Sequence, residues 1–336
     1  MVTTGEKYER LQQTLAGQTP DRVPVALWRR WPGDDERTAD YAHAVIDFQR
    51  TYDWDFVRIQ PAATYCVADY GVQSIRSDKL DGDRMITRWP VGRSLDWTRL
   101  RALDPLRGEL GKHLSVLEMV RDALPTVPLV TTIYSPFAQA RKLAAEDAAV
   151  RHLRTRTKRL RKGLEVLTET LLAYIAELAR REIDGVFYVL DGADYSLMGK
   201  EEYAKLALPF DRQVLEAFPQ KWWLNALELP GSAPMFEFAA SFPIHMLHWD
   251  SHFASPSLST AQEQAADRVF AAGWSAEPHL YRGTPAIIRD IAREQVTATD
   301  GKRLILTAGG PLPVGTPLSN LRAAREAVEI PRVRQL

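Results

Sequence analysis

The sequence predicts an α/β fold, a single (β/α)8 barrel of the TIM type, and three observations lead to it. Short apolar runs alternate with longer helix-forming stretches from one end of the chain to the other, as in a parallel sheet built from βα units. Eight such runs are present, the number of strands in such a barrel. No fixed-period repeat and no Ser/Gly linker interrupts the chain, so residues 1–336 are expected to form one domain.

The elements follow in order. A helix is expected over residues 5–16, and residues 23–28 ("VPVALW") form the first predicted strand after Pro20. The other predicted strands are 54–60, 127–135, 184–190, 221–225, 243–249, 268–274 and 302–309. Helices are expected at 38–52, 109–124, from 137, 147–181 (as one helix or two), 200–217, 234–240, 258–266, 285–297 and 317–329. An extra hairpin is predicted near residues 71–91.

Composition excludes several classes of protein. The chain is 45% hydrophobic and 26% charged, as in an ordinary globular protein, and 43 basic residues balance 43 acidic ones. A net charge of zero gives no reason to expect nucleic acid or an anionic membrane as partner. The single Cys66 allows no internal disulfide and no multi-cysteine metal site. Without a signal-like or membrane-spanning run, we expect a cytoplasmic location.

A barrel places its active site at the carboxyl ends of the strands. Arg29 and Arg30 end the first predicted strand, and a guanidinium binds a carboxylate or phosphate in a bidentate way. Flanking tryptophans would exclude water from that pairing. The alternative is a salt bridge with one of the acidic residues at 34–36.

The stretch "IHMLHWDSHF" (244–253) gathers three histidines and an aspartate. Strand alternation puts His248 and Asp250 on one side and His245 on the other. Three hypotheses remain open: a metal site formed by His248, Asp250 and His252; a general acid or base at His248; or hydrogen-bonded structural groups. We expect no metal.

Other polar residues are expected at the same rim. Asp191 and Asp194 are candidates for a general acid or for a carboxylate that positions the ligand, and the alternative for both is to cap a helix or turn. The remaining predicted substrate-binding residues are Arg30, Arg58, Gln60, Tyr65, Tyr134, Asn225, Glu228 and Gly310. This inventory of arginines, aromatic rings and carboxylates suggests an anionic, planar small molecule as substrate.

Four segments resemble the uroporphyrinogen decarboxylase superfamily: "ERLQQTLAGQTPDRVPVALWR", "TIYSPFAQARKLA", "DGVFYVLDGADYSLMGKEEYAKLALPFDRQVLEAF" and "LILTAGGPLPVGTPLSNLRAAREAVE". The resemblance implies the same barrel fold. It also implies one of two chemistries, decarboxylation of a tetrapyrrole without cofactor or methyl transfer involving a corrinoid. The methyltransferases hold zinc with a His-x-Cys pair and a later Cys, where this chain has Asn225, Leu227 and Gly310.

The decarboxylase pattern is also incomplete. Arg29 matches its first arginine, while Gly33 stands at its second and Gly310 at its histidine. Our hypothesis is nevertheless a decarboxylase-like carboxy-lyase that acts on an anionic tetrapyrrole-like or aromatic carboxylate without a cofactor. His248 or Asp191 would supply the proton, and Arg29 would hold the carboxylate. The alternatives are a corrinoid-linked methyltransferase without the usual zinc site and a non-catalytic tetrapyrrole- or corrinoid-binding protein. The resemblance makes a homodimer plausible.

Overall fold

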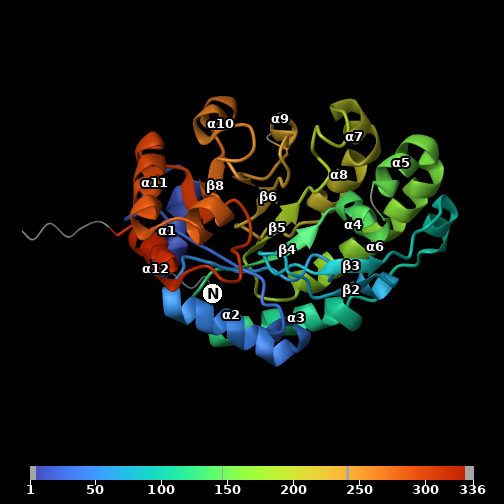
Figure 1. The fold of residues 1–336 in the computed structure, drawn as a ribbon, viewed down its shortest axis with the longest axis horizontal. Coiled ribbons are helices and arrows are strands. Elements are labelled where there is room, and N and C mark those ends of the chain that lie inside the picture. The colour runs from blue at the N-terminus through green and yellow to red at the C-terminus, as the bar shows by residue number, and fades with distance from the viewer. Residues whose placement is uncertain (1–4, 146, 240–241, 330–336) are drawn as a thin grey trace, which may run out of the picture.

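The computed structural model describes residues 5–145, 147–239 and 242–329, which fold as helices around a curled parallel sheet (Figure 1). The sheet has seven strands in the order β1-β4-β5-β6-β7-β8-β9. They are β1 (Val57–Ile59), β4 (Leu129–Tyr134), β5 (Gly185–Val189), β6 (Ala226–Glu228), β7 (Met246–His248), β8 (Val269–Trp274) and β9 (Leu304–Ala308). The predicted α/β architecture with a parallel sheet is confirmed.

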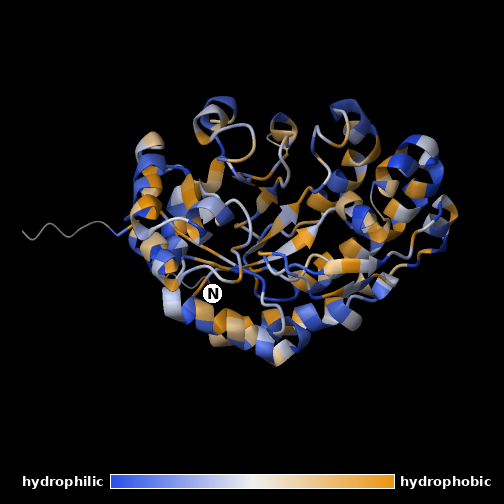
Figure 2. Ribbon diagram, in the orientation of Figure 1, coloured by the Kyte–Doolittle hydropathy of each residue, from blue (hydrophilic) through white to orange (hydrophobic). Residues whose placement is uncertain are grey.

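The helices lie within a few residues of the predicted stretches, and the stretch at 200–217, predicted as one helix, is divided into two. They are α1 (Glu6–Leu15), α2 (Thr38–Tyr52), α3 (Gly108–Ala123), α4 (Pro136–Leu143), α5 (Ala148–Thr155), α6 (Thr157–Ala179), α7 (Lys200–Leu206), α8 (Leu208–Glu216), α9 (Phe236–Ala239), α10 (Leu258–Gln264), α11 (Pro285–Ala298) and α12 (Leu318–Glu326). Their apolar sides pack on the sheet, and Figure 2 shows hydrophobic and hydrophilic residues mixed along the outer helices.

The predicted first strand, residues 23–28, is not one of the seven strands of the sheet. Its backbone makes only isolated parallel bridges, Val25 with Leu306 and Arg29 with Leu312. On its other side the Asp55 amide donates to the Val25 carbonyl oxygen at 3.0 Å. The segment therefore lies between β9 and β1, but it bonds too irregularly to be an eighth strand.

The predicted hairpin is present. Strands β2 (Gln73–Ile75) and β3 (Met85–Arg88) pair antiparallel, with an irregularity between Gln73 and Ser74. The connection between them brings Asp81 and Asp83 back to the carboxyl edge of the main sheet, beside Arg30. The hairpin thus supplies charged groups that strand-end reasoning does not anticipate.

The strand predicted at residues 221–225 begins later than expected. Residues 221–224 form no strand, and β6 runs from Ala226 to Glu228 in register with β5 and β7. Glu228 therefore ends the strand at the carboxyl edge, while Asn225 precedes its first residue. This shift decides which of the two side chains can reach a site at that edge.

Helix starts at the carboxyl edge are well specified by sequence. Pro136 occupies the first turn of α4, directly after β4, and the Ser135 side chain accepts a hydrogen bond from the Ala138 amide at 3.1 Å. Thr284 and Pro285 repeat this arrangement at α11. These caps fix the residues at which α4 and α11 begin after the preceding strands.

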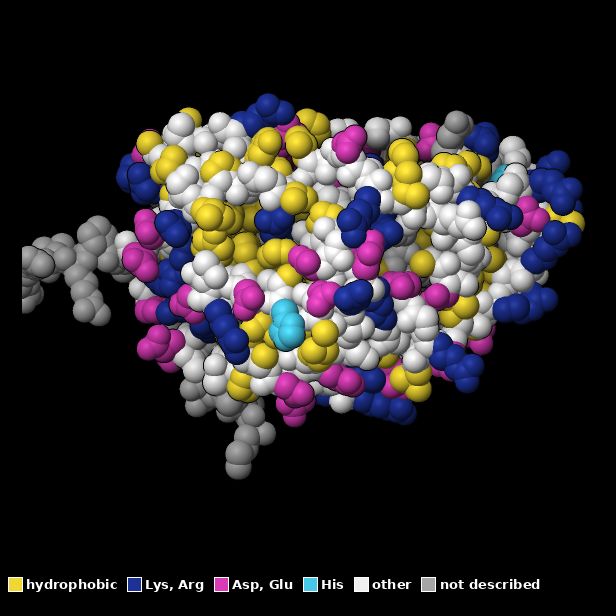
Figure 3. All heavy atoms as spheres, turned by 60° about the horizontal axis from the view of Figure 1, so that its bottom comes forward, with side chains coloured by type: hydrophobic (Ala, Val, Ile, Leu, Met, Phe, Trp, Pro, Cys, Tyr) yellow, Lys and Arg dark blue, Asp and Glu magenta, His cyan; other side chains and the backbone are white. Residues whose placement is uncertain are grey.

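On the face shown in Figure 3, acidic and basic side chains are interspersed, so neither sign of charge dominates that surface. Within the described residues, no helix has the length and apolar character needed to cross a membrane.

Candidate functional site

A cavity of about 480 Å³ opens at the carboxyl ends of the strands, and we call it the mouth cavity. Residues from the ends of β1, β4, β5 and β6 contribute to its wall, together with the loops that follow β7 and β9 and the β2–β3 hairpin. Its polar and charged lining residues are Arg30, Gln60, Asp81, Asp83, Tyr134, Lys142, Asp191, Glu228, Ser232 and Asp250. Its size suits a small molecule.

A buried ion pair reaches the floor of the mouth cavity. Arg58 donates from Nη2 to Oε2 of Glu228 in a short contact, and from Nε to the Thr132 hydroxyl at 3.0 Å. Its guanidinium lies over two rings, 4.0 Å from the centre of Phe187 and 4.6 Å from that of Trp28. Burial, the largest single influence, favours the neutral acid, but the opposing influences together, chiefly the charge and the hydrogen bond of Arg58, lower the pKa of Glu228. Glu228 is therefore an ionised carboxylate that faces the cavity.

Arg30, and not Arg29, lines the mouth cavity. Arg30 pairs with Asp81 at 2.5 Å and approaches Asp83 at 3.5 Å. Arg29 points out of the barrel, with its guanidinium 4.7 Å from the centre of the Trp31 ring. The prediction that Arg29 holds a substrate carboxylate is not supported, because the two neighbouring side chains face opposite ways and only Arg30 faces in.

Asp191 also lines the cavity, but as the anion of an ion-pair cluster. Arg141 donates to its Oδ1 in a short contact, and Lys142 donates to its Oδ2 at 3.2 Å. Burial alone would raise the pKa of Asp191, yet the two cations together lower it. A carboxylate held ionised in this way has no proton to give, so the acid role expected of Asp191 is not supported. Lys142 also lies 4.4 Å from the centre of the Tyr134 ring.

His248 lies beneath the cavity rather than in its wall. The side chain is fully buried between Trp28 and Phe187, and Nε2–H donates to the Ala308 carbonyl oxygen at 2.8 Å. Burial lowers the pKa of His248, so the ring is neutral and its one proton is committed to Ala308. The geometry gives no support to the general-acid role predicted for His248.

The three candidate metal ligands of the histidine stretch make separate contacts. His252 Nε2–H donates to the Gly273 carbonyl oxygen at 2.9 Å, and Asp250 accepts from the Ser275 hydroxyl at 2.6 Å. Nowhere in the described part of the chain do three His, Cys, Asp or Glu side chains converge as ligands. His248, Asp250 and His252 are therefore separate groups, of which Asp250 alone lines the cavity.

Two predicted substrate-binding residues have structural roles instead. Both carboxylate oxygens of Asp194 accept backbone amides, from Ser196 at 2.7 Å and from Ala233 at 3.1 Å. Asn225 accepts from the Val186 amide and donates to a backbone carbonyl in the loop before β6, away from the mouth. For Asp194, the turn-capping alternative is the one that the structure shows.

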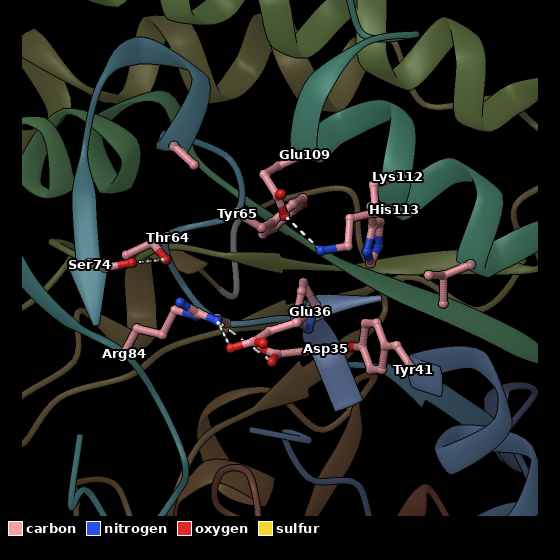
Figure 4. Close-up of a pocket in the computed structure, with 14 residues that line it drawn as sticks. Asp35, Glu36, Tyr41, Thr64, Tyr65, Ser74, Arg84, Glu109, Lys112 and His113 are labelled. Atoms are coloured by element: carbon pink, nitrogen blue, oxygen red, sulfur yellow. Dashed lines mark hydrogen bonds and ion pairs between the residues drawn. The ribbon is translucent and has the colours of Figure 1, made fainter. Parts of the chain in front are cut away.

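Tyr65 belongs to a second cavity, of about 330 Å³, which lies between α2, α3 and the hairpin. Figure 4 shows it there beside His113, facing Arg84 and Tyr41 across the cavity. Its hydroxyl donates to the Thr132 carbonyl oxygen at 2.7 Å. Tyr65 thus follows β1, as predicted, but it lines the second cavity and not the mouth cavity.

The remaining predicted residues, Gln60, Tyr134, Glu228 and Gly310, all line the mouth cavity. Sequence reasoning missed Asp81, Asp83 and Phe253 because they lie on connections whose path depends on tertiary contacts. A signal for the first two exists, since "DGD" at 81–83 marks a tight turn that can return acidic side chains to a basic strand end.

This fold and this mouth define an α/β protein of the TIM type, and comparison with known proteins identifies its family. Residues 6–330 match the family model described as uroporphyrinogen decarboxylase (URO-D), so the chain belongs to that family.

Two curated relatives of the chain are methyltransferases. The methylcobamide:CoM methyltransferases MtbA of Methanosarcina acetivorans and Methanosarcina mazei are 20% and 21% identical to it, over 96% of this chain and 97% of theirs. A solved methyltransferase from Methanosarcina mazei superposes with a TM-score of 0.83 at 19% identity, covering 95% of this chain and 96% of the other. A B12-independent methionine synthase from Shewanella sp. W3-18-1 superposes with a TM-score of 0.58 at 13% identity, covering 92% and 94%. The expectation of a carboxy-lyase is therefore wrong.

The zinc site implied by the methyltransferase branch does not fit this chain. Asn225 uses its amide for backbone hydrogen bonds, Leu227 is apolar and buried, and Gly310 has no side chain. Zinc requires three or four nitrogen, sulfur or oxygen ligands at about 2.0–2.3 Å. These positions supply none, so no catalytic step is assigned to zinc here.

Proposed function

We propose that this protein is a methyltransferase that takes a methyl group from a methylated corrinoid and passes it to a small acceptor bound in the mouth cavity. The observation that supports this best is the cavity itself, with the ionised Glu228 facing it from the carboxyl end of β6. The family and the names of the relatives support the donor class. A corrinoid macrocycle is too large for the cavity and would cover its opening from outside.

The methyl transfer can be described without a metal bound to the protein. The acceptor's lone pair forms a bond to the methyl carbon, and the carbon–cobalt bond of the donor breaks with its electron pair left on cobalt. The acceptor's proton passes to the Glu228 carboxylate, to which it is hydrogen-bonded, and from there to water. Arg58 holds that carboxylate in place, and Gln60 offers a second polar contact to the acceptor. Their shared task is positioning, which by itself can supply several kcal/mol of a barrier.

Anaerobic incubation with methylcobalamin and a small thiol, with coenzyme M and simple neutral and amino thiols tried in turn, tests the proposal. Loss of the methyl–cobalt absorbance that depends on the protein and continues in a zinc chelator supports it. Chelator-sensitive turnover would contradict the zinc-independent part. Binding of methylcobalamin without methyl loss to coenzyme M or to simple neutral and amino thiols would point to a corrinoid-binding protein instead.

A further inference from the structure

The lining of the mouth cavity carries an excess of negative charge. Five carboxylates and two cations line it. The carboxylates are Asp81, Asp83, Asp191, Glu228 and Asp250, and the cations are Arg30 and Lys142. Arg58 and Arg141, which support the wall from behind, reduce this excess but do not reverse it.

Every cation at the mouth already has a carboxylate partner. Arg30 is bound by Asp81 and Asp83, and Lys142 shares Asp191 with Arg141. An incoming carboxylate or sulfonate would therefore meet cations whose charge is already neutralised, and it would lie close to the carboxylates that neutralise them. Repulsion between like charges opposes its binding there.

Asp250 is the opposite case, a carboxylate that forms no ion pair with any cation in the described part of the chain. Its Oδ1 accepts from the Ser275 hydroxyl at 2.6 Å and from the amides of His252 and Phe253 at 3.2 Å each. No hydrogen bond and no ion pair is found on Oδ2 among the residues that the structure describes. Gly309 packs against Asp250 so tightly that a Cβ there would lie 2.4 Å from the Asp250 Cβ, which fixes where the carboxylate stands.

We infer, on the basis of the proposed methyl-transfer function, that the acceptor carries no negative charge and is neutral or positively charged, with Asp250 as the group that receives its cationic or hydrogen-donating end. Phe253, which is 74% exposed at the rim, adds an aromatic face beside that end. The sequence had suggested an anionic substrate because it shows the arginines but not the carboxylates that neutralise them.

Three thiols of matched size test this inference. Coenzyme M, 2-mercaptoethanol and cysteamine share a two-carbon thiol and differ at the other end, which is an anion, a neutral hydroxyl and a cation. We expect kcat/KM for methylcobalamin demethylation to be about tenfold or more higher with cysteamine than with coenzyme M, since a single charge contact in a cleft has this order of effect. 2-Mercaptoethanol should fall between them.

An Asp250→Asn variant should lower the cysteamine to coenzyme M ratio several-fold, whatever happens to the absolute rates. The asparagine keeps an oxygen for the Ser275 and amide donors, so the loop has no reason to unfold. The matched control is Asp290→Asn, at an exposed aspartate of α11 that pairs only with Arg293 in the described structure. The control should leave the ratio unchanged.

The outcomes separate this inference from the proposed function. Fastest turnover with coenzyme M would overturn the charge preference while it supports methyl transfer. If no thiol is methylated, the proposed function fails, and calorimetric binding of the same three compounds then decides the inference. Tighter binding of cysteamine supports it, and equal or tighter binding of coenzyme M overturns it.

Discussion

At the scale of single residues, the buried pair between Arg58 and Glu228 supports the floor of the mouth cavity. Glu228→Gln would leave the Arg58 guanidinium buried without its counterion, although it keeps the shape of the side chain. We expect this variant to lose about 3–5 kcal/mol of unfolding free energy, the usual cost of breaking a buried pair. Urea unfolding at neutral pH measures it.

The double variant Arg58→Met with Glu228→Gln is the control for that loss. It removes the orphaned charge, so it should be more stable than Glu228→Gln alone. A double variant that is less stable than the single one would show that Arg58 contributes mainly through its contacts with Trp28 and Phe187.

The two glycines after β9 should respond in opposite ways to substitution. A Cβ on Gly310 meets no atom within 4 Å, whereas one on Gly309 would run into Asp250. Gly310→Leu should therefore fill the mouth cavity, weaken acceptor binding about tenfold or more, and change the unfolding free energy by no more than about 0.5 kcal/mol. Gly309→Ala should cost about 1–3 kcal/mol through overpacking.

Calorimetry with cysteamine and urea unfolding on the same preparations check both glycine variants. Unchanged binding in Gly310→Leu would mean that the acceptor does not occupy this part of the cavity.

Single residues also show where sequence reasoning succeeds and where it stops. Strand alternation correctly turns His248 inward, because a strand has only two sides. It cannot distinguish Arg29 from Arg30, since residues 23–28 bond irregularly and the inward direction is set by β9 and by the hairpin aspartates. Nor can it detect that Asp81 neutralises Arg30, a contact between residues 51 positions apart.

Among the elements, the helices were predictable to within a few residues, although one predicted helix, 200–217, is two, and the strands were less predictable. Helix α2 begins and ends where its pattern predicts, from Thr38 to Tyr52. Strand β6 is displaced because "KWWLN" has the composition of a strand but precedes the residues that pair with β5. Pairing between strands is decided by neighbours distant in sequence, which a local pattern does not contain.

The packing of α7 and α8 on β5 makes stability depend on pH. Asp211 of α8 accepts hydrogen bonds from the hydroxyls of Tyr188 and Tyr203, both at 2.7 Å, in a fully buried position. Burial raises the pKa of Asp211 from 3.8 to about 7, although the two hydroxyls oppose the shift. The folded protein therefore holds a proton between these two pKa values that the unfolded chain has released.

Stability from this group should fall as the pH rises from about 4 to about 7 and level off above, since the native state binds the extra proton in that window. Asp211→Asn does not titrate and should lack this contribution. Between pH 5 and pH 7.5 the wild type should lose about 2 kcal/mol more unfolding free energy than the variant. Urea unfolding of both proteins at the two pH values measures the difference. An equal change in unfolding free energy between pH 5 and pH 7.5 in the wild type and in Asp211→Asn would contradict the raised pKa.

For the whole molecule, the fold class followed from the order of elements, whereas the charge balance of the mouth did not. The parallel sheet needs only alternating apolar runs and helices, which are local and repeated. The mouth is built by single residues from strand ends, loops and a hairpin, and its sign depends on which of them pair. Only the three-dimensional structure shows that the arginines are neutralised.

The irregular segment around residues 24–29 fills the gap between β9 and β1 in the curled sheet. A buried aspartate holds this segment in place. Asp55, which is fully buried, accepts from Arg10 of α1 at 2.6 Å, from Arg22 at 2.7 Å, and from the Val25 amide at 2.7 Å. The same carboxylate thus ties the first helix, the irregular segment and the start of β1 together. The segment depends on this anchor because it lacks a regular strand ladder.

Asp55→Asn should therefore loosen this junction before the rest of the molecule. We expect a loss of about 3–5 kcal/mol in unfolding free energy and faster hydrogen exchange at the Ala26 and Leu306 amides, which bond across the junction. Asp21→Asn is the control, because Asp21 also pairs with Arg10 but is 61% exposed, and it should cost less than about 1 kcal/mol. If exchange at Ala26 is unchanged in Asp55→Asn, the segment is held by its apolar contacts, and the aspartate is not what joins β9 to β1.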